Sequence, residues 1–216
     1  MRYSVVLFDL DGTLLDTLDD LTAAVNFALK GQDLPVCTRE EIRSYIGNGV
    51  VILLARAAKE QSGEVDAEKM LADFKEYYTA HCQDETRPYG GVMEMLSMLK
   101  AEGRKVGVVS NKVDFATKGL CKAYFGDCID VAIGENEGAG VRKKPAPDSV
   151  LAAMQILGAT PADTVYIGDS EVDIQTAKNA GIPCISVLWG FKDRDFLLEN
   201  GATCLAEDVE TLRRFL

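Results

Sequence analysis

The sequence has very little histidine, no closely spaced cysteines and no long apolar run. His81 is the single histidine among 216 residues, so acid–base pairs and metal sites built on several histidines are excluded. The six cysteines are scattered singly, without a Cys-x-x-Cys pair, which argues against a zinc site or a thioredoxin-type redox pair. Carboxylates therefore remain as the side chains that move protons and hold metal.

An excess of positive charge is also missing, because the formal net charge is −11. Binding to nucleic acid or to an anionic membrane surface needs clustered Lys and Arg. No apolar stretch approaches the roughly 20 residues of a membrane helix, and the uncharged run at residues 3–8 is too short for a signal peptide. We expect a cytoplasmic protein that binds neither nucleic acid nor membrane. Its oligomeric state, monomer or homodimer, stays open.

The apolar run that starts at Val5 ends abruptly in two carboxylates, Asp9 and Asp11, followed by Gly12 and Thr13. Side chains at positions i and i+2 of a strand point to the same face, so both carboxylates face the same way at the strand end. Such crowding is usually relieved by a divalent cation or by a shared proton. A simple Asp-Gly turn after a strand is the structural alternative.

From Val92 onward, helical and strand patterns alternate, which is typical of a parallel sheet with helices on both faces. The predicted strands lie near residues 105–109, 130–134, 164–168, 184–188 and 203–205. Between about Asp16 and Arg87 the pattern is only helical, with a capping-box signature at Thr38 to Glu41. We therefore predict an α/β fold: a doubly wound parallel sheet formed by residues 1–15 and 88–216, with an all-helical cap of residues 16–87 inserted after the first strand.

Three further polar clusters lie at or just beyond strand ends, where open α/β sheets bind their ligands. Ser110-Asn111 follows one strand, the segment from Lys143 to Pro147 reads Lys-Lys-Pro-Ala-Pro, and Asp169 to Asp173 follows another strand. Together with the Asp9 cluster, in this order and at this spacing, they resemble the four motifs of the haloacid dehalogenase superfamily. The resemblance spans nearly the whole chain.

The resemblance implies a Rossmann-like core and phosphoryl transfer to an aspartate. Asp9 is expected to be the nucleophile that forms an aspartyl phosphate, and Asp11 the general acid and base. In the family, the backbone carbonyl of the position of Asp11 binds Mg²⁺ while its side chain stays free for protons. Leu10 and Gly12 then offer backbone amides to the phosphate, and Thr13 buttresses Asp11.

The second and third motifs imply contacts with the phosphate. Ser110 and Asn111 are expected to donate hydrogen bonds to its oxygens, although a Ser-Asn pair can also simply turn the chain. Lys144 is expected to neutralise both phosphate and nucleophile, with Lys143 as the alternative lysine.

The fourth motif completes a metal site. Asp169 and Asp173 are expected to hold the cation with Asp9 and Asp11, Asp169 directly and Asp173 through water, because oxygen ligands without histidine or thiolate suit Mg²⁺. A helix cap followed by a solvated carboxylate is the structural alternative.

The second acid and the metal ligands favour phosphate chemistry over carbon–halogen hydrolysis. A phosphomutase would share the same catalytic residues and stays open. A phosphate-accepting receiver domain fits poorly, because it needs no insertion of about 70 residues after the first strand.

The segment from Tyr45 to Gly49 resembles the cap loop of phosphoglycolate phosphatases, and residues 187–191 resemble a later part of the same subgroup. Asn48 would then contact the leaving group, although a glycine-flanked turn explains the loop equally well. We expect a Mg²⁺-dependent phosphatase acting on a small phosphorylated metabolite, with 2-phosphoglycolate the first candidate. Pyrophosphate, nucleoside monophosphates and sugar phosphates are the alternatives.

Overall fold

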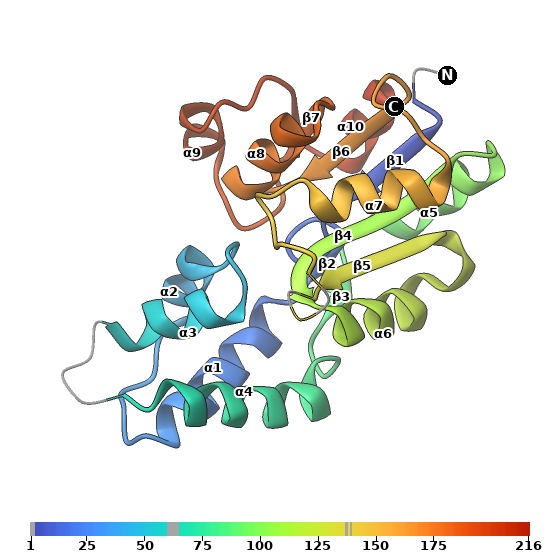
Figure 1. Ribbon diagram of the computed structural model, residues 1–216. Helices are drawn as coiled ribbons and strands as arrows, with labels where there is room; N and C mark the ends of the chain where they lie inside the picture. Colours follow the sequence, from blue (N-terminus) through green and yellow to red (C-terminus); the bar gives the residue numbers. More distant parts are fainter. Residues whose placement is uncertain (1–2, 60–64, 137, 139) are drawn as a thin grey trace. The chain divides into compact units, whose positions relative to one another are not determined.

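The computed structural model describes residues 3–59, 65–136, 138 and 140–216 (Figure 1). The chain divides into two compact units. We call residues 1–15 with 88–216 the core unit, and residues 16–87 the helical unit.

The core unit is built on a six-stranded sheet in the order β5-β4-β1-β6-β7-β8, with every neighbouring pair parallel. Its strands are β1 (Val5–Phe8), β4 (Lys105–Val113), β5 (Val131–Glu135), β6 (Thr164–Gly168), β7 (Cys184–Val187) and β8 (Leu205–Ala206). The predicted doubly wound α/β fold is thereby confirmed. Later strands lie on both sides of β1, with β4 and β5 on one side and β6, β7 and β8 on the other. Open sheets of this kind bind their ligands at the carboxyl ends of the strands, beside the point where the strand order reverses.

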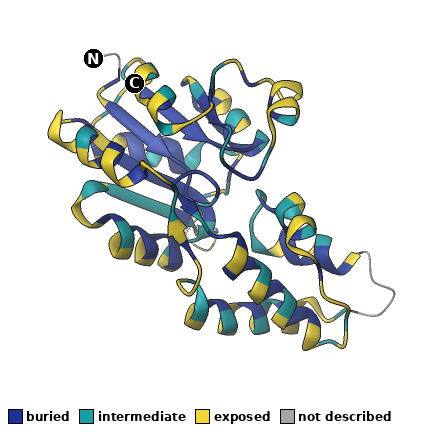
Figure 2. Cartoon of the chain, turned by 180° about the vertical axis from the view of Figure 1, so that it is seen from behind, coloured by how far each residue is buried: buried dark blue, intermediate teal, exposed yellow. Residues whose placement is uncertain are grey.

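Helices cover the sheet and leave their outer faces to solvent (Figure 2). They are α5 (Val92–Ala101), α6 (Asp114–Phe125), α7 (Asp148–Leu157), α8 (Glu171–Ala180), α9 (Arg194–Glu199) and α10 (Val209–Phe215), with a 3₁₀ turn η1 at Gly126–Cys128. Every residue of β1 and β6 is buried. Continuous burial of this kind is typical of parallel strands with helices on both faces.

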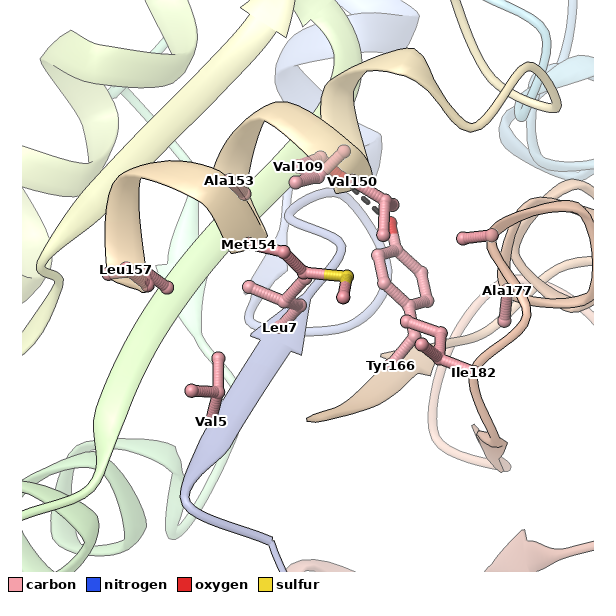
Figure 3. Close-up of a cluster of buried hydrophobic side chains, with 11 residues drawn as sticks. Val5, Leu7, Val109, Val150, Ala153, Met154, Leu157, Tyr166, Ala177 and Ile182 are labelled. Carbon is pink, nitrogen blue, oxygen red and sulfur yellow. Dashed lines mark hydrogen bonds between the residues drawn. The ribbon is translucent and has the colours of Figure 1, made fainter. Parts of the chain in front are cut away.

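An apolar cluster beneath α7 and α8 fixes the central strands relative to one another (Figure 3). Tyr166 of β6 packs there with Leu7 of β1 and Met154 of α7, and it is fully buried. Its hydroxyl donates a hydrogen bond to the carbonyl of Val109 in β4, at 2.9 Å. This bond ties β6 to β4 across β1, close to the carboxyl ends of the strands.

One strand is clearly longer than predicted. We expected it to end at Val109, but β4 continues to Val113. Its pairing with β5 is irregular there, because Val109 pairs with Ile133 whereas Val113 pairs with Glu135. Two extra residues on β4 form a bulge, and bulges redirect side chains. The irregular segment begins at the Ser110-Asn111 pair.

The helical unit contains α1 (Leu18–Lys30), α2 (Arg39–Tyr45), α3 (Val50–Lys59) and α4 (Ala67–His81). The predicted capping box is present at the start of α2, where Thr38 N–H donates to Glu41 Oε2 at 2.6 Å and Glu41 N–H donates to Thr38 Oγ1 at 3.3 Å. The sequence pattern predicts a helix from Val50 to Gln61, and the last two of these residues lie outside the described part of the chain.

Two short strands, β2 (Leu15–Asp16) and β3 (Arg87–Pro88), pair where the chain passes between the units. None of the helices in the described ranges combines the length and the apolar character needed to span a membrane.

Candidate active site

Three carboxylates that are far apart in sequence meet at the carboxyl ends of β1 and β6. Asp9 follows β1, Asp169 follows β6, and Asp173 lies in the first turn of α8. All three are buried, and one carboxylate oxygen of each lies within 4.8 Å of the others. Three negative charges this close repel one another strongly unless positive charge is supplied.

Lys144 supplies part of that charge. Its Nζ lies 2.9 Å from Asp9 Oδ1 and 2.8 Å from Asp173 Oδ1, and it donates to the Tyr166 hydroxyl at 3.1 Å. Burial by itself lowers the pKa of Lys144, but the charges of Asp173 and Asp9 outweigh it and raise the pKa well above the usual value. Lys144 is therefore an ammonium ion. Of the two neighbouring lysines, it is the one whose amine lies against these carboxylates.

The carboxylates still carry uncompensated charge. Burial raises the pKa of Asp9 from 3.8 to about 7, with Lys144 opposing the rise and Asp173 adding to it. Burial also raises the pKa of Asp169 well above its usual value, helped by the charges of Asp173 and Asp9. Both shifts mean that burial, together with the neighbouring carboxylates, disfavours the ionised forms of Asp9 and Asp169.

Asp169 is held by two segments of the core unit. The Thr13 hydroxyl donates to Oδ1 at 3.2 Å, and the Phe191 N–H donates to Oδ2 at 2.7 Å. Trp189 Nε1 in turn donates to the Thr13 carbonyl at 3.0 Å. Gly12 has φ +83°, and a Cβ there would lie 2.4 Å from Asp169 Oδ2. Glycine is thus required at this position both by its conformation and by the close approach of the carboxylate.

Asp173 is fixed by the start of α8. Its Oδ2 accepts hydrogen bonds from Ser170 N–H at 3.1 Å and from Ser170 Oγ at 2.6 Å. Its other oxygen accepts from Lys144. The position one helical turn beyond Asp169 therefore points its carboxylate into the cluster.

Asp11 has a neighbour that our sequence reasoning missed. Lys112 Nζ lies 3.0 Å from Asp11 Oδ1, with side chains that are only 5% and 14% exposed. Thr13, which we expected beside Asp11, donates its hydroxyl to Asp169. The only indication in the sequence that Lys112 belongs to the site was its position directly after Ser110-Asn111. The bulge in β4 sets the direction of the Lys112 side chain, and no sequence pattern predicted that bulge.

The two backbone amides expected at the phosphate have partners within the chain. Leu10 N–H donates to Asp9 Oδ1 at 2.7 Å, and Gly12 N–H donates to the Leu15 carbonyl at 2.9 Å. Their binding to phosphate stays a prediction.

Ser110 and Asn111 are both buried beside this cluster. Ser110 Oγ accepts a hydrogen bond from Lys112 N–H at 3.2 Å. The Asn111 side chain donates to the Lys144 carbonyl at 3.0 Å and accepts from the Lys144 N–H at 2.8 Å. Asn111 therefore clamps the backbone of Lys144, a role that the sequence did not suggest. The expected phosphate contacts of both residues stay predictions.

Asn48 belongs to the helical unit. Its Oδ1 accepts a hydrogen bond from Arg56 Nη2 at 2.7 Å, and Arg56 Nη1 donates to the Tyr45 carbonyl at 2.7 Å. Arg56 thus closes the Tyr45 to Gly49 loop, and contact of Asn48 with a leaving group stays a prediction.

The donor set fits a divalent cation. When all four carboxylates are ionised, the two ammonium groups leave two negative charges to be neutralised; the groups are Asp9, Asp11, Asp169 and Asp173, with Lys112 and Lys144. The three clustered groups offer only carboxylate oxygens, which hard cations prefer. The arrangement can hold a cation beside a carboxylate nucleophile.

Comparison with known proteins shows the family of this chain. Residues 6–187 match the family of haloacid dehalogenase-like hydrolases. The chain is 33% identical over 214 residues to phosphoglycolate phosphatase 1 of Pseudomonas aeruginosa, covering 96% of this chain and 78% of that protein. It is 35% identical, with the same coverage, to a phosphoglycolate phosphatase of Pseudomonas putida.

Among solved structures, a crystal structure from Lactobacillus delbrueckii subsp. bulgaricus, reported as a candidate phosphoglycolate phosphatase, superposes with a TM-score of 0.92. It is 35% identical in sequence, and the match covers 100% of this chain and 98% of that one. Family, relatives and fold agree with one another, and the chain belongs to the haloacid dehalogenase-like hydrolases.

Proposed function

We propose that this protein is a Mg²⁺-dependent phosphatase that hydrolyses a small phosphate monoester through an aspartyl phosphate on Asp9, with 2-phosphoglycolate as the preferred substrate. The observation that carries the proposal is the position of Asp9, whose carboxylate lies 2.9 Å from the Lys144 ammonium and within 4.8 Å of carboxylate oxygens of Asp169 and Asp173. The similarity to phosphoglycolate phosphatases supports the choice of substrate.

In the first half-reaction, a carboxylate oxygen of Asp9 attacks the phosphorus and the bond from phosphorus to the ester oxygen breaks. The leaving oxygen takes a proton from the carboxyl group of Asp11, so that an alcohol departs. The Lys144 ammonium, 2.9 Å from Asp9, reduces the repulsion between the nucleophile and the phosphate anion.

In the second half-reaction, Asp11 is a carboxylate and removes a proton from a water molecule. That water attacks the phosphorus of the aspartyl phosphate, the bond from phosphorus to Asp9 breaks, and inorganic phosphate is released. Asp9 and protonated Asp11 are regenerated, so the cycle balances.

Asp9, Asp169 and Asp173, with the backbone carbonyl of Asp11, would hold the cation. When bound, Mg²⁺ supplies positive charge that neutralises and orients the phosphate. Thr13, Phe191 and Ser170 keep the carboxylates in place for it through the hydrogen bonds described above.

The test is a panel of phosphorylated metabolites assayed with Mg²⁺ for release of inorganic phosphate. The panel contains 2-phosphoglycolate, pyrophosphate, hexose phosphates and nucleoside monophosphates, and Asp9→Asn is the inactive control. We expect 2-phosphoglycolate to give the highest kcat/KM. A higher kcat/KM for pyrophosphate or a hexose phosphate would overturn the assignment of the substrate but leave the assignment as a phosphatase standing.

Acid-quenched enzyme should carry one phosphoryl group on Asp9 by mass spectrometry, and Asp9→Asn should carry none. Wild-type protein that turns over substrate without this modification would contradict the covalent mechanism. Isomerised sugar phosphate, formed without release of inorganic phosphate, would favour a phosphomutase instead.

A further inference from the structure

Lys112 is a second lysine at the candidate active site, and its amine lies against a different carboxylate from that of Lys144. Its Nζ lies 3.0 Å from Asp11 Oδ1, and its side chain is 5% exposed. Lys144 already lies against Asp9 and Asp173. The two lysines therefore have different partners: Lys144 contacts Asp9 and Asp173, and Lys112 contacts Asp11.

Asp11 Oδ1 needs such a partner. This atom is buried, and it accepts no well-aligned hydrogen bond from the residues that the structure describes. A buried carboxylate oxygen without hydrogen bonds destabilises the folded protein unless a positive charge lies close to it. Lys112 provides that charge and fixes which oxygen of Asp11 faces the protein.

Stability alone gives little reason to keep this pair. Buried ion pairs lose much of their attraction to desolvation, and an apolar pair of similar volume is often as stable. The bulge in β4 also redirects the chain at the position of Lys112, between the regular pairs at Val109 and Val113. Bulges of this kind frequently re-aim side chains at active sites.

We infer that Lys112 is a positioning residue for Asp11: it holds Oδ1 so that Oδ2 remains free to exchange a proton with the leaving group. The inference rests on the proposed function, since it concerns the acid of that reaction. In this role Lys112 acts through Asp11 and not on the phosphorus or the cleaved bond.

The test compares Lys112→Met with Asp11→Asn and with the double variant. Two aryl phosphates without a carboxylate are used: phenyl phosphate, whose leaving group is poor and needs protonation, and p-nitrophenyl phosphate, whose leaving group departs readily. The measured quantity is kcat/KM at saturating Mg²⁺, which reports the steps up to formation of the aspartyl phosphate. Lys105→Met is the matched control, because Lys105 lies at the opposite end of the same strand and donates to the Leu157 carbonyl.

We expect Lys112→Met to lower kcat/KM for phenyl phosphate by about 10- to 100-fold, within the range of general acid catalysis, and to affect p-nitrophenyl phosphate much less. Adding Lys112→Met to Asp11→Asn should cause no further loss, because the residue acts only through Asp11. Lys112→Arg should restore part of the activity, and Lys105→Met should retain wild-type values.

Equal losses on both aryl phosphates, or a full further loss in the double variant, would overturn the inference. The same variants are also assayed on 2-phosphoglycolate; a loss confined to that substrate would overturn the inference, because it would place Lys112 on the carboxylate of the substrate. If Lys112→Met fails to fold by circular dichroism, Lys112→Gln carries the same comparison. Phosphorylation of Asp9 in the wild type separates this result from the proposed function, which fails only if that modification is absent.

Discussion

Replacing Lys144 with methionine removes an ammonium group while keeping most of the length of the side chain. Nζ of Lys144 contacts Asp9, Asp173 and the hydroxyl of Tyr166, and the side chain is 2% exposed. Removing one partner of a buried ion pair costs about 3–5 kcal/mol, because a buried charge is left uncompensated. The total unfolding free energy of a protein is typically about 5–15 kcal/mol. We therefore expect Lys144→Met to remove a large part of the stability of the metal-free protein near neutral pH.

The loss should depend on pH with a definite sign. The pKa of Asp9 is raised from 3.8 to about 7, so the folded protein holds this proton more tightly than the unfolded chain does. The contribution of Asp9 to stability is thus fully present below about pH 4 and is lost as the pH rises through about 7. Lys144 opposes the rise of this pKa, so its removal should raise the pKa further. The destabilisation by Lys144→Met should be largest above pH 7 and small below pH 4.

Urea unfolding followed by tryptophan fluorescence measures this effect in the core unit. Trp189 is the single tryptophan, and its indole N–H donates to the Thr13 carbonyl beside the site. Lys143→Met is the control: Lys143 is half-buried, and its replacement should change the unfolding free energy by less than about 0.5 kcal/mol. A loss below about 1 kcal/mol for Lys144→Met at neutral pH would refute the argument that Lys144 neutralises the clustered carboxylates.

Three further outcomes are expected. Tyr166→Phe removes the hydroxyl that accepts a hydrogen bond from Lys144, so kcat/KM for 2-phosphoglycolate should fall by about 10-fold, through a lower kcat. The control is Thr176→Val, which loses a buried hydrogen bond to the Val172 carbonyl and should leave kcat/KM unchanged. Equal effects of both variants would contradict a role of Tyr166 through Lys144. Mg²⁺ should raise the unfolding temperature of the metal-free protein by an amount that grows as the pH rises towards 7, because metal binding needs ionised Asp9. Scanning calorimetry with Mg²⁺ and with chelator measures this increase at each pH. An increase that is the same at every pH would contradict the prediction. Asn48→Ala should lower kcat/KM for 2-phosphoglycolate and spare an aryl phosphate, whereas a proportional loss on both substrates would show that its bond to Arg56 only stabilises the loop.

Much of the fold was predictable because its signals are local. The alternation of helices and strands after Val92, the capping box at Thr38 and the buried strand before Asp9 each depend on residues within a few positions of one another. Parallel strands end at the same edge of a sheet, so polar residues at the strand ends could be assigned to one place. The six strands form one parallel sheet, and Asp9, Asp169 and Asp173 meet at that edge.

The pairing of side chains within that edge was decided only by the tertiary structure. Lys112 contacts Asp11, the Thr13 hydroxyl bonds Asp169, and the Asn111 side chain clamps the backbone of Lys144. These partners are far apart in sequence, and the strand register, the bulge in β4 and the side-chain rotamers together set which atoms meet. A contact of about 3 Å changes with small shifts in any of these. Residue types at strand ends therefore determine that a charged site forms. Only the packing of the folded chain determines which lysine contacts which carboxylate.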